Sequence, residues 1–190
     1  MVAQKWVDVS SADYGVSLLN DSKYGFDVKE GVIRMTALRS STDPDPKADE
    51  GAHEFSYALY PHAGRWQEAQ TVLRGYEFNT PVVILPVEQH VGSLPSSFSF
   101  MQFGNPSVVL TAVKKCEDDK NLIVRCYEAT GKSAQERMRL WQPIARIQET
   151  DLIEWNPKPV SREGSGDAGL SFNLRPGEIK TFLITLGKEQ

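Results

Sequence analysis

Apolar and polar residues alternate along almost the whole chain, and this period of two constrains the fold more than any other feature. No long segment keeps a convincing helical period. Successive side chains of a strand point to opposite faces, so alternation predicts strands with one buried and one wetted face. The strands recur with turn residues between them, which is typical of a sandwich rather than of strand–helix–strand units. The sequence therefore predicts an all-β fold, an antiparallel β-sandwich architecture in two lobes.

The alternating segments give the bounds of the expected strands. In the first half we expect strands over residues 6–9, 14–20, 25–29, 32–37, 54–60 and 72–78. In the second half we expect them over residues 98–103, 108–114, 122–128, 134–141, 144–149, 170–174 and 179–186. Gly31 stands where a positive φ closes a tight turn, which predicts a hairpin around it. Residues 162–169, REGSGDAG, are typical of a surface loop.

An apolar segment interrupted by prolines separates the two lobes. Residues 81–95 read PVVILPVEQHVGSLP, and proline cannot donate to a strand ladder, so we do not expect a central strand there. We place the boundary near residue 92, which gives lobes over residues 1–92 and 93–190. The first residues run directly into a strand pattern, so we expect the first lobe to be incomplete.

The charge of the chain narrows the classes of partner. A net charge of -4 and a pI near 5.4 give no basic surface, so we expect no nucleic acid and no membrane partner. No apolar run reaches the ~18 residues of a membrane span, and the start, MVAQKWVDVSS, lacks the apolar core of a signal peptide. We therefore expect a cytoplasmic protein. Its charge does not exclude neutral ligands such as sugars.

The chain offers few residues for metal or nucleophilic chemistry. Cys116 and Cys126 flank a predicted turn, but in the hairpin they are offset along the strands by about 13 Å, at ~3.3 Å per residue. A disulfide needs its α-carbons within ~7 Å, so we expect two free thiols. His53 and His62 lie at opposite ends of a predicted strand, too far apart to share a metal ion. The sequence has no GxSxG elbow and no glycine loop for a phosphate. We predict no catalytic residue, no metal site and no cofactor in this chain.

A loop rich in acids and stiffened by proline precedes the predicted strand over residues 54–60. It carries Arg39 and then Asp43 and Asp45, each of which stands directly before a proline. Proline fixes its own backbone angle and pushes the preceding residue into an extended conformation. A stiff loop loses less entropy when it binds, so we expect this loop to reach toward a ligand or partner.

Several segments of the chain are specific enough to suggest a family. They are WVDVSSADYGVSLLNDSKYGFDV from residue 6, LRSSTDPDPKADEGAHEFSYALYPH from residue 38, VVLTAVKKCEDDKNLIVRCYEATG from residue 108, and IQETDLIEWN with LRPGEIKTFLITL from residues 147 and 174. Together they resemble the C-terminal β region of glycoside hydrolase family 38 α-mannosidases, of the bacterial and fungal cytosolic or vacuolar type.

This resemblance implies a parent enzyme whose catalytic half lies outside this chain. In the family, an N-terminal α/β barrel holds one zinc ion, the nucleophilic Asp and the acid, and a helical bundle follows. Residues 1–92 would be the closing part of the central β-sandwich, and residues 93–190 the C-terminal β-sandwich domain. The parent would be a retaining exo-α-mannosidase acting on terminal α-mannosides. This chain alone would be inactive, and the N-terminal catalytic half would be its partner.

The same resemblance implies a role for the acid-rich loop. The strand and loop ending in MTALRSS correspond to a region from which an arginine of the C-terminal part reaches into the sugar site. Arg39 is therefore the candidate substrate-binding residue, with Asp43 and Asp45 as its orienting neighbours. The alternative is an ordinary loop arginine paired with one of these carboxylates. Ser22 and Ser41 depart from the Cys and Pro that the family often has, and the second departure loosens this loop.

Two other functions stay open at this point. An independent carbohydrate-binding sandwich would use the rings of Tyr60, Trp66 or Tyr76 as a platform for sugar faces. A purely structural domain would instead build subunit contacts, for example in a homo-oligomer.

Overall fold

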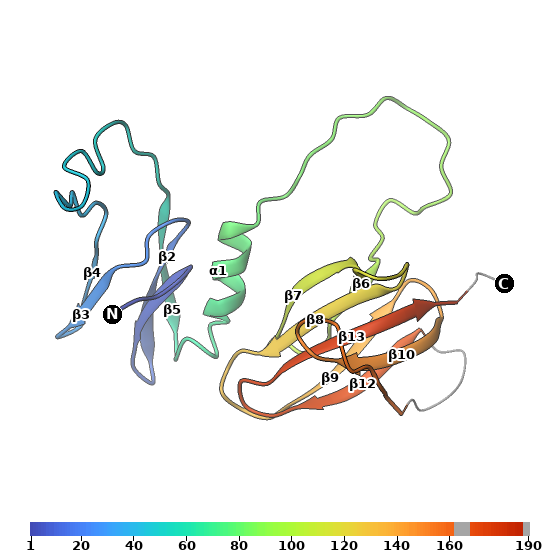
Figure 1. The fold of residues 1–190 in the computed structure, drawn as a ribbon. Coiled ribbons are helices and arrows are strands. Elements are labelled where there is room, and N and C mark those ends of the chain that lie inside the picture. The colour runs from blue at the N-terminus through green and yellow to red at the C-terminus, as the bar shows by residue number, and fades with distance from the viewer. Residues whose placement is uncertain (162–167, 188–190) are drawn as a thin grey trace. The chain divides into compact units, whose positions relative to one another are not determined.

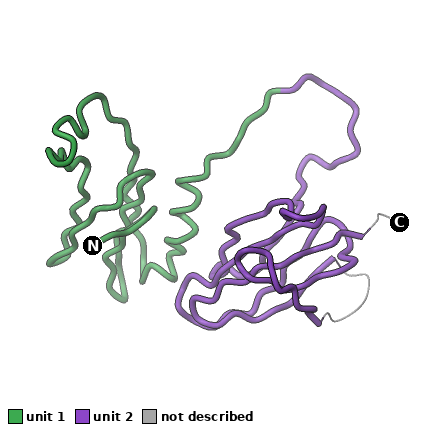
Figure 2. The backbone as a smooth tube through the Cα atoms, in the orientation of Figure 1, with its two compact units in different colours: residues 1–86 green, residues 87–190 purple. Residues whose placement is uncertain are grey.

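The structure is a computed structural model that describes residues 1–161 and 168–187. The chain divides into two compact units, residues 1–86 and 87–190 (Figure 2). The boundary predicted near residue 92 falls in the extended segment that follows α1. Most of the surface loop predicted over residues 162–169 lies outside the described residues. Among the helices of the described part, none has the length and apolar character to cross a membrane.

Unit 1 is built on a three-stranded antiparallel sheet in the order β1-β2-β5 (Figure 1). Its strands are β1 (Trp6–Ser10), β2 (Tyr14–Asn20) and β5 (Tyr57–Ala63). β3 (Phe26–Lys29) and β4 (Val32–Met35) form the predicted hairpin, with Gly31 at a φ of 76°. β2 is largely buried because it pairs with a neighbour on each side.

The strand predicted over residues 72–78 is wrong, because this segment forms the helix α1 (Thr71–Asn79). Thr71 and Gly75 are buried and stand one helical turn apart, on the same face of the helix. A Cβ on residue 75 would lie 2.9 Å from Trp6 Cδ1, so the glycine lets the helix approach β1 closely. The fold is mostly β, as predicted, with this one short helix in the part that the structure describes.

Unit 2 is a sandwich of two antiparallel sheets. The larger has the strand order β11-β10-β13-β8-β7 and the smaller the order β12-β9-β6 (Figure 1). The strands are β6 (Met101–Gln102), β7 (Val108–Lys115), β8 (Leu122–Glu128), β9 (Ala134–Leu140), β10 (Ile144–Thr150), β11 (Lys158–Pro159), β12 (Gly169–Leu174) and β13 (Ile179–Leu186). Alternation predicted all of them except the two-residue β11, and it predicted a longer strand over residues 98–103 where only β6 forms.

The sheets of unit 2 share one apolar core. β9 follows the predicted alternation, with every second residue from Ala134 to Leu140 buried. Phe182 of β13 is fully buried, and its ring centroid lies 4.8 Å from that of Phe172 on β12. The wetted and buried faces were therefore readable from the sequence, because each sheet of a sandwich has one face in the core.

Both cysteines are buried free thiols, as predicted. Cys126 stands opposite Leu110 in the β7–β8 pair, just before a register shift in β7. Burial raises the pKa of the Cys126 thiol to about 12. The thiol therefore stays protonated at neutral pH, and a protonated thiol is a poor nucleophile.

Two glutamates are buried in unit 2 and hold loops through backbone amides. Glu128 accepts hydrogen bonds from the amides of Gly131 and Gly177 at 2.9 and 3.1 Å. Glu136 accepts one from the amide of Gly104 at 2.7 Å. Burial acts to raise the pKa of Glu128, but its hydrogen bonds from a neighbouring hydroxyl and from backbone amides outweigh burial, so the pKa lies below its ordinary value.

We expect the Glu128→Gln variant to show a shallower rise of stability with pH than the wild type. A carboxyl whose pKa is lowered by folding stabilises the folded state above its unfolded pKa, near 4.5, and the stabilisation is lost as the pH falls through the lower folded value. Urea unfolding at a series of pH values between about 3 and 6 measures this slope. Glu50→Gln, at an exposed glutamate, is the control, and equal slopes in the wild type and Glu128→Gln would contradict the assignment.

Candidate functional site

The predicted site loop connects β4 to β5, and its own acidic side chains brace it. Asp49 Oδ2 accepts a hydrogen bond from the Ser40 amide at 2.8 Å, which ties the start of the loop to its middle. Asp45 Oδ1 accepts one from the Lys47 amide at 2.9 Å. The His53 ring lies 2.8 Å from the Asp49 carbonyl oxygen. The loop is therefore fixed by local hydrogen bonds although most of it is exposed.

Arg39 lies in a recess of about 440 Å³ on unit 1. Asp49 and His53 line the same recess, together with residues 22–25 and 36–38. Arg39 is exposed, and within the described ranges its guanidinium makes no ion pair with a carboxylate. A guanidinium in this position has its donors free for a ligand.

The three predicted site residues are not brought together in the way the sequence suggested. Asp43 and Asp45 are exposed, as Arg39 is, but neither lines the recess. The structure instead places Arg39 beside Asp49 and His53. Asp45 supports the fold of the loop through a backbone amide. The role of Arg39, Asp43 and Asp45 in sugar binding stays a prediction.

A buried polar cluster in unit 1 escaped the sequence analysis. His62 Nε2 lies 2.8 Å from Asp8 Oδ2 and 3.3 Å from Ser17 Oγ, and the Ser17 hydroxyl lies 2.9 Å from that of Thr71. The side chains of Asp8 and His62 are each only 3% exposed. The sequence offered one signal, Gly15 within a predicted strand, since a glycine there often marks a close approach by another group. The structure shows this approach, because a Cβ on residue 15 would lie 2.4 Å from His62 Cε1.

The cluster has the residue types of a hydrolytic triad but not its geometry. In a triad, histidine directs one ring nitrogen at the nucleophile and the other at the acid. Here Asp8 and Ser17 both face Nε2, and Nδ1 lies 3.4 Å from the carbonyl oxygen of Ala63. Ser17 is fully buried, so no substrate reaches it. The cluster is therefore structural and ties α1 to the sheet.

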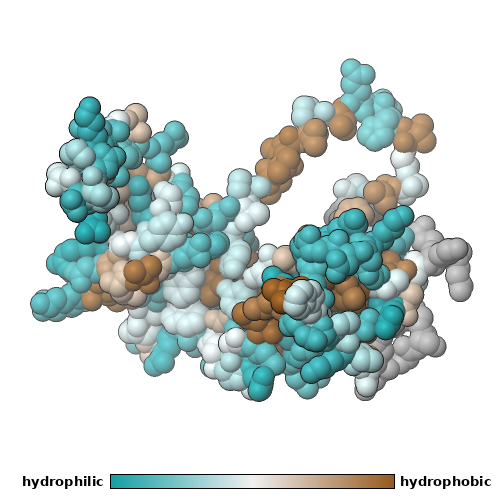
Figure 3. Space-filling view, viewed as in Figure 1, coloured by the Kyte–Doolittle hydropathy of each residue, from teal (hydrophilic) through white to brown (hydrophobic). Residues whose placement is uncertain are grey.

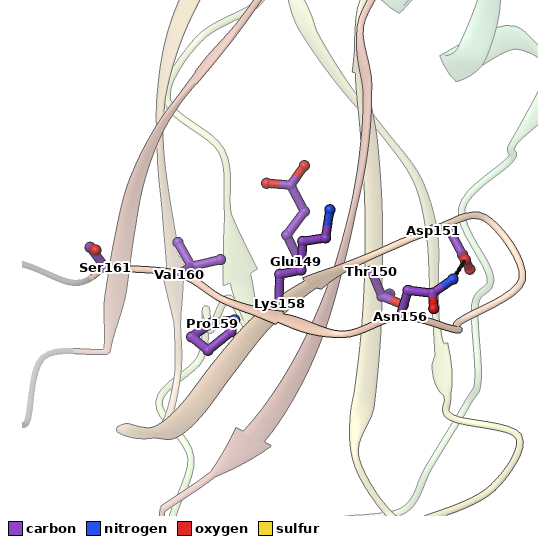
Figure 4. A pocket seen from close by; sticks show the side chains of 8 residues that line it. All are labelled: Glu149, Thr150, Asp151, Asn156, Lys158, Pro159, Val160 and Ser161. Carbon is purple, nitrogen blue, oxygen red and sulfur yellow. Dashed lines mark hydrogen bonds between the residues drawn. The ribbon is translucent and has the colours of Figure 1, made fainter.

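A larger recess, of about 860 Å³, lies in unit 2 where β10 ends (Figure 4). Its lining residues are Glu149, Thr150, Asp151, Asn156, Lys158, Pro159, Val160 and Ser161. Asp151 accepts a hydrogen bond from Asn156 at 3.0 Å, and Glu149 accepts two from Lys180 at 2.9 Å. These polar groups already have partners within the protein. Across residues 1–161 and 168–187, no group of three or more His, Cys, Asp or Glu side chains is arranged to hold a metal ion.

The aromatic platform expected for an independent sugar-binding module is not exposed. Trp66 packs against Trp6 with ring centroids 5.2 Å apart, and it is half-buried. Tyr60 and Tyr76 are half-buried as well. Trp155, in the loop after β10, is the one exposed tryptophan of the four, all of which the structure describes, with 63% of its surface accessible. A platform built on a tryptophan would therefore have to use Trp155, although Tyr14, Tyr24 and Tyr57 are exposed as well.

Comparison with known proteins gives the class of this fold. Residues 107–182 match the domain described as the glycosyl hydrolases family 38 C-terminal beta sandwich domain. Residues 1–47 match the domain described as the glycosyl hydrolases family 38 C-terminal domain. Both descriptions place these domains at the C-terminal end of glycosyl hydrolases of family 38. The chain belongs to glycosyl hydrolase family 38 and corresponds to the non-catalytic C-terminal domains of its α-mannosidases.

The relatives are much longer than this chain. Alpha-mannosidase 2C1 of Mus musculus is 34% identical over 188 residues, which cover 97% of this chain and 18% of that protein. Alpha-mannosidase G of Dictyostelium discoideum is 33% identical over 187 residues, covering 96% of this chain and 17% of that one. The crystal structure of an alpha-mannosidase from Enterococcus faecalis has the same fold, with a TM-score of 0.76 and 24% identity over 97% of this chain and 21% of that one. The chain thus spans about a fifth of the length of these relatives.

We expect Ser17→Ala to lower the free energy of unfolding by about 1–3 kcal/mol, because the buried Asp8 carboxylate loses its hydroxyl donor. That hydroxyl donates to Asp8 Oδ2 at 2.7 Å. Urea unfolding measures the change. Ser171→Ala, at an exposed serine of β12, is the matched control and should change stability by less than about 0.5 kcal/mol. Equal losses in the free energy of unfolding for the two substitutions would show that the buried cluster does not stabilise the fold.

Proposed function

We propose that this chain is the C-terminal part of a retaining, zinc-dependent exo-α-mannosidase, which it stabilises and to whose sugar-site rim it contributes the loop over residues 38–53. Membership of family 38 supports this, as do relatives that are named α-mannosidases and are about five times longer. The zinc ion, the nucleophile and the acid would belong to the preceding catalytic half. The whole enzyme would act on terminal α-mannosides in the cytoplasm, and this chain alone would be inactive.

The observation that carries the proposal is the exposed guanidinium of Arg39 in its recess. Arginine presents several donors in a rigid, planar fork, which suits the hydroxyl groups of a sugar or a catalytic carboxylate. Within the part that the structure describes, no carboxylate already pairs with it. The loop that carries it is fixed through Asp49, so less entropy is lost when the arginine binds.

Asp43 and Asp45 would act through the loop rather than on the sugar. Asp45 fixes the turn that follows through the Lys47 amide. Asp43 stands two residues before it, in the same proline-stiffened run. Both are therefore positioning residues in this proposal, and Arg39 is the group that contacts the substrate.

We expect Arg39→Ala in the full-length α-mannosidase to lower mannoside turnover by more than about tenfold, the loss expected when a positioned, charge-bearing donor is removed from the sugar site. The melting temperature should stay within about 2 °C of the wild type, since the side chain is exposed. Steady-state kinetics with an aryl α-mannoside measures the loss.

The matched control is Arg146→Ala, at an exposed arginine of β10 for which the described residues offer no ion pair. Arg146→Ala should keep wild-type kinetics. If the turnover of Arg39→Ala is close to that of this control, the assignment of Arg39 to the sugar site is wrong.

A stand-alone carbohydrate-binding module is the second candidate, and the exposure of Trp155 is the observation that favours it. Under this alternative, mannose should quench the tryptophan fluorescence of the isolated chain saturably at millimolar concentration, and Trp155→Ala should abolish the change. Under our leading proposal the fluorescence stays constant. Galactose at the same concentrations controls for nonspecific effects.

A further inference from the structure

One segment exposes a run of large apolar side chains. Residues 81–95, here called the apolar linker, follow α1 and contain neither helix nor strand. The exposed fractions in it are 88% for Val82, 84% for Val83, 85% for Ile84, 76% for Leu85, 72% for Val87 and 100% for Val91. Glu88 is its one Asp, Glu, Lys or Arg residue, and Figure 3 shows hydrophobic side chains along this part of the chain. Soluble proteins rarely leave such a surface uncovered.

The backbone of the apolar linker is preset for an extended partner-bound form. Pro81 and Pro86 frame Val82–Leu85, and Pro86 holds Leu85, the residue before it, in an extended conformation. Its β-branched residues favour the same conformation. In the described structure, the backbone groups of Val82–Leu85 make no hydrogen bond to the rest of the protein. Their donors and acceptors are therefore free to pair with another strand or loop.

The side-chain pattern indicates the shape of the surface that would receive this segment. In an extended chain, Val82 and Ile84 point to one side while Val83 and Leu85 point to the other. Both sides are apolar, which is typical of a strand buried on both faces. A flat surface would cover only one side, so the receiving surface must be a groove with apolar walls.

The lengths of the relatives indicate what supplies this groove. The match to the mouse protein runs over 188 residues, so it extends across the linker, and it leaves about four fifths of that protein unmatched. The two matched family domains, over residues 1–47 and 107–182, lie on either side of the linker. We propose that the apolar linker docks into an apolar groove of the catalytic region that precedes these domains in α-mannosidases. The inference rests on the proposed function.

Limited proteolysis with thermolysin, which cleaves beside large apolar residues, tests the docking. The linker should be cut at least about tenfold more slowly in the full-length α-mannosidase than in the 190-residue chain, because docking must open before cleavage. Ile84→Asp in the full-length enzyme should restore fast cleavage. Val113→Asp, at a half-exposed valine of β7, should leave the protection unchanged.

Other outcomes would overturn the proposal. Equal cleavage rates in the two forms would show that the linker stays exposed in the enzyme or is already covered within the 190 residues. Protection that rises with concentration in both forms would show that a second copy covers it. The readout does not depend on catalysis. If Arg39→Ala lowers turnover but the linker is cleaved freely in the full-length enzyme, this inference alone is overturned. If the linker is protected but Arg39→Ala keeps wild-type turnover, only the role of the loop is overturned.

Discussion

The loops of both units depend on carboxylates that accept backbone N–H groups. Glu128 and Glu136 do this inside the sandwich of unit 2, and Asp45 and Asp49 do it on the surface of unit 1. An amide without a partner is costly to bury, and a charged acceptor makes a strong hydrogen bond with it. The small excess of acids over bases in this chain is therefore partly structural. Asp45 and Asp49 serve the backbone of their loop, and Arg39 has no carboxylate partner in the described part of the chain.

The strands were readable from the sequence where one face of a sheet meets a core. The bounds of β2, β8 and β13 agree with those expected from alternation alone. The helix α1 was misread because its nine residues are too few to show a helical period, and its apolar residues happen to alternate in part. Its conformation is stabilised by contact with Trp6, far away in sequence, which no local pattern could reveal.

The site was predicted less completely than the fold, for a related reason. Arg39 lies in an exposed recess, and composition and proline spacing were enough to draw attention to its loop. Its neighbours Asp49 and His53 are set by how the loop turns back on itself, which spacing alone does not fix. The buried cluster around His62 draws one side chain each from β1, β2, β5 and α1. Only the tertiary fold brings these four elements together. His62, expected at the end of a strand, is therefore buried inside unit 1.

The close approach of Gly15 to His62 also limits how this lineage can change. A methyl group at residue 15 would collide with the imidazole and, at 2.5 Å, with Ser10 Cβ. An alanine there requires a smaller residue in place of the histidine and also a shift of the β1–β2 pair that moves Ser10 away. That replacement by itself leaves the Asp8 carboxylate without one of its two close partners. The order in which these positions mutate therefore matters, and the shortest evolutionary route between two stable sequences passes through a less stable intermediate.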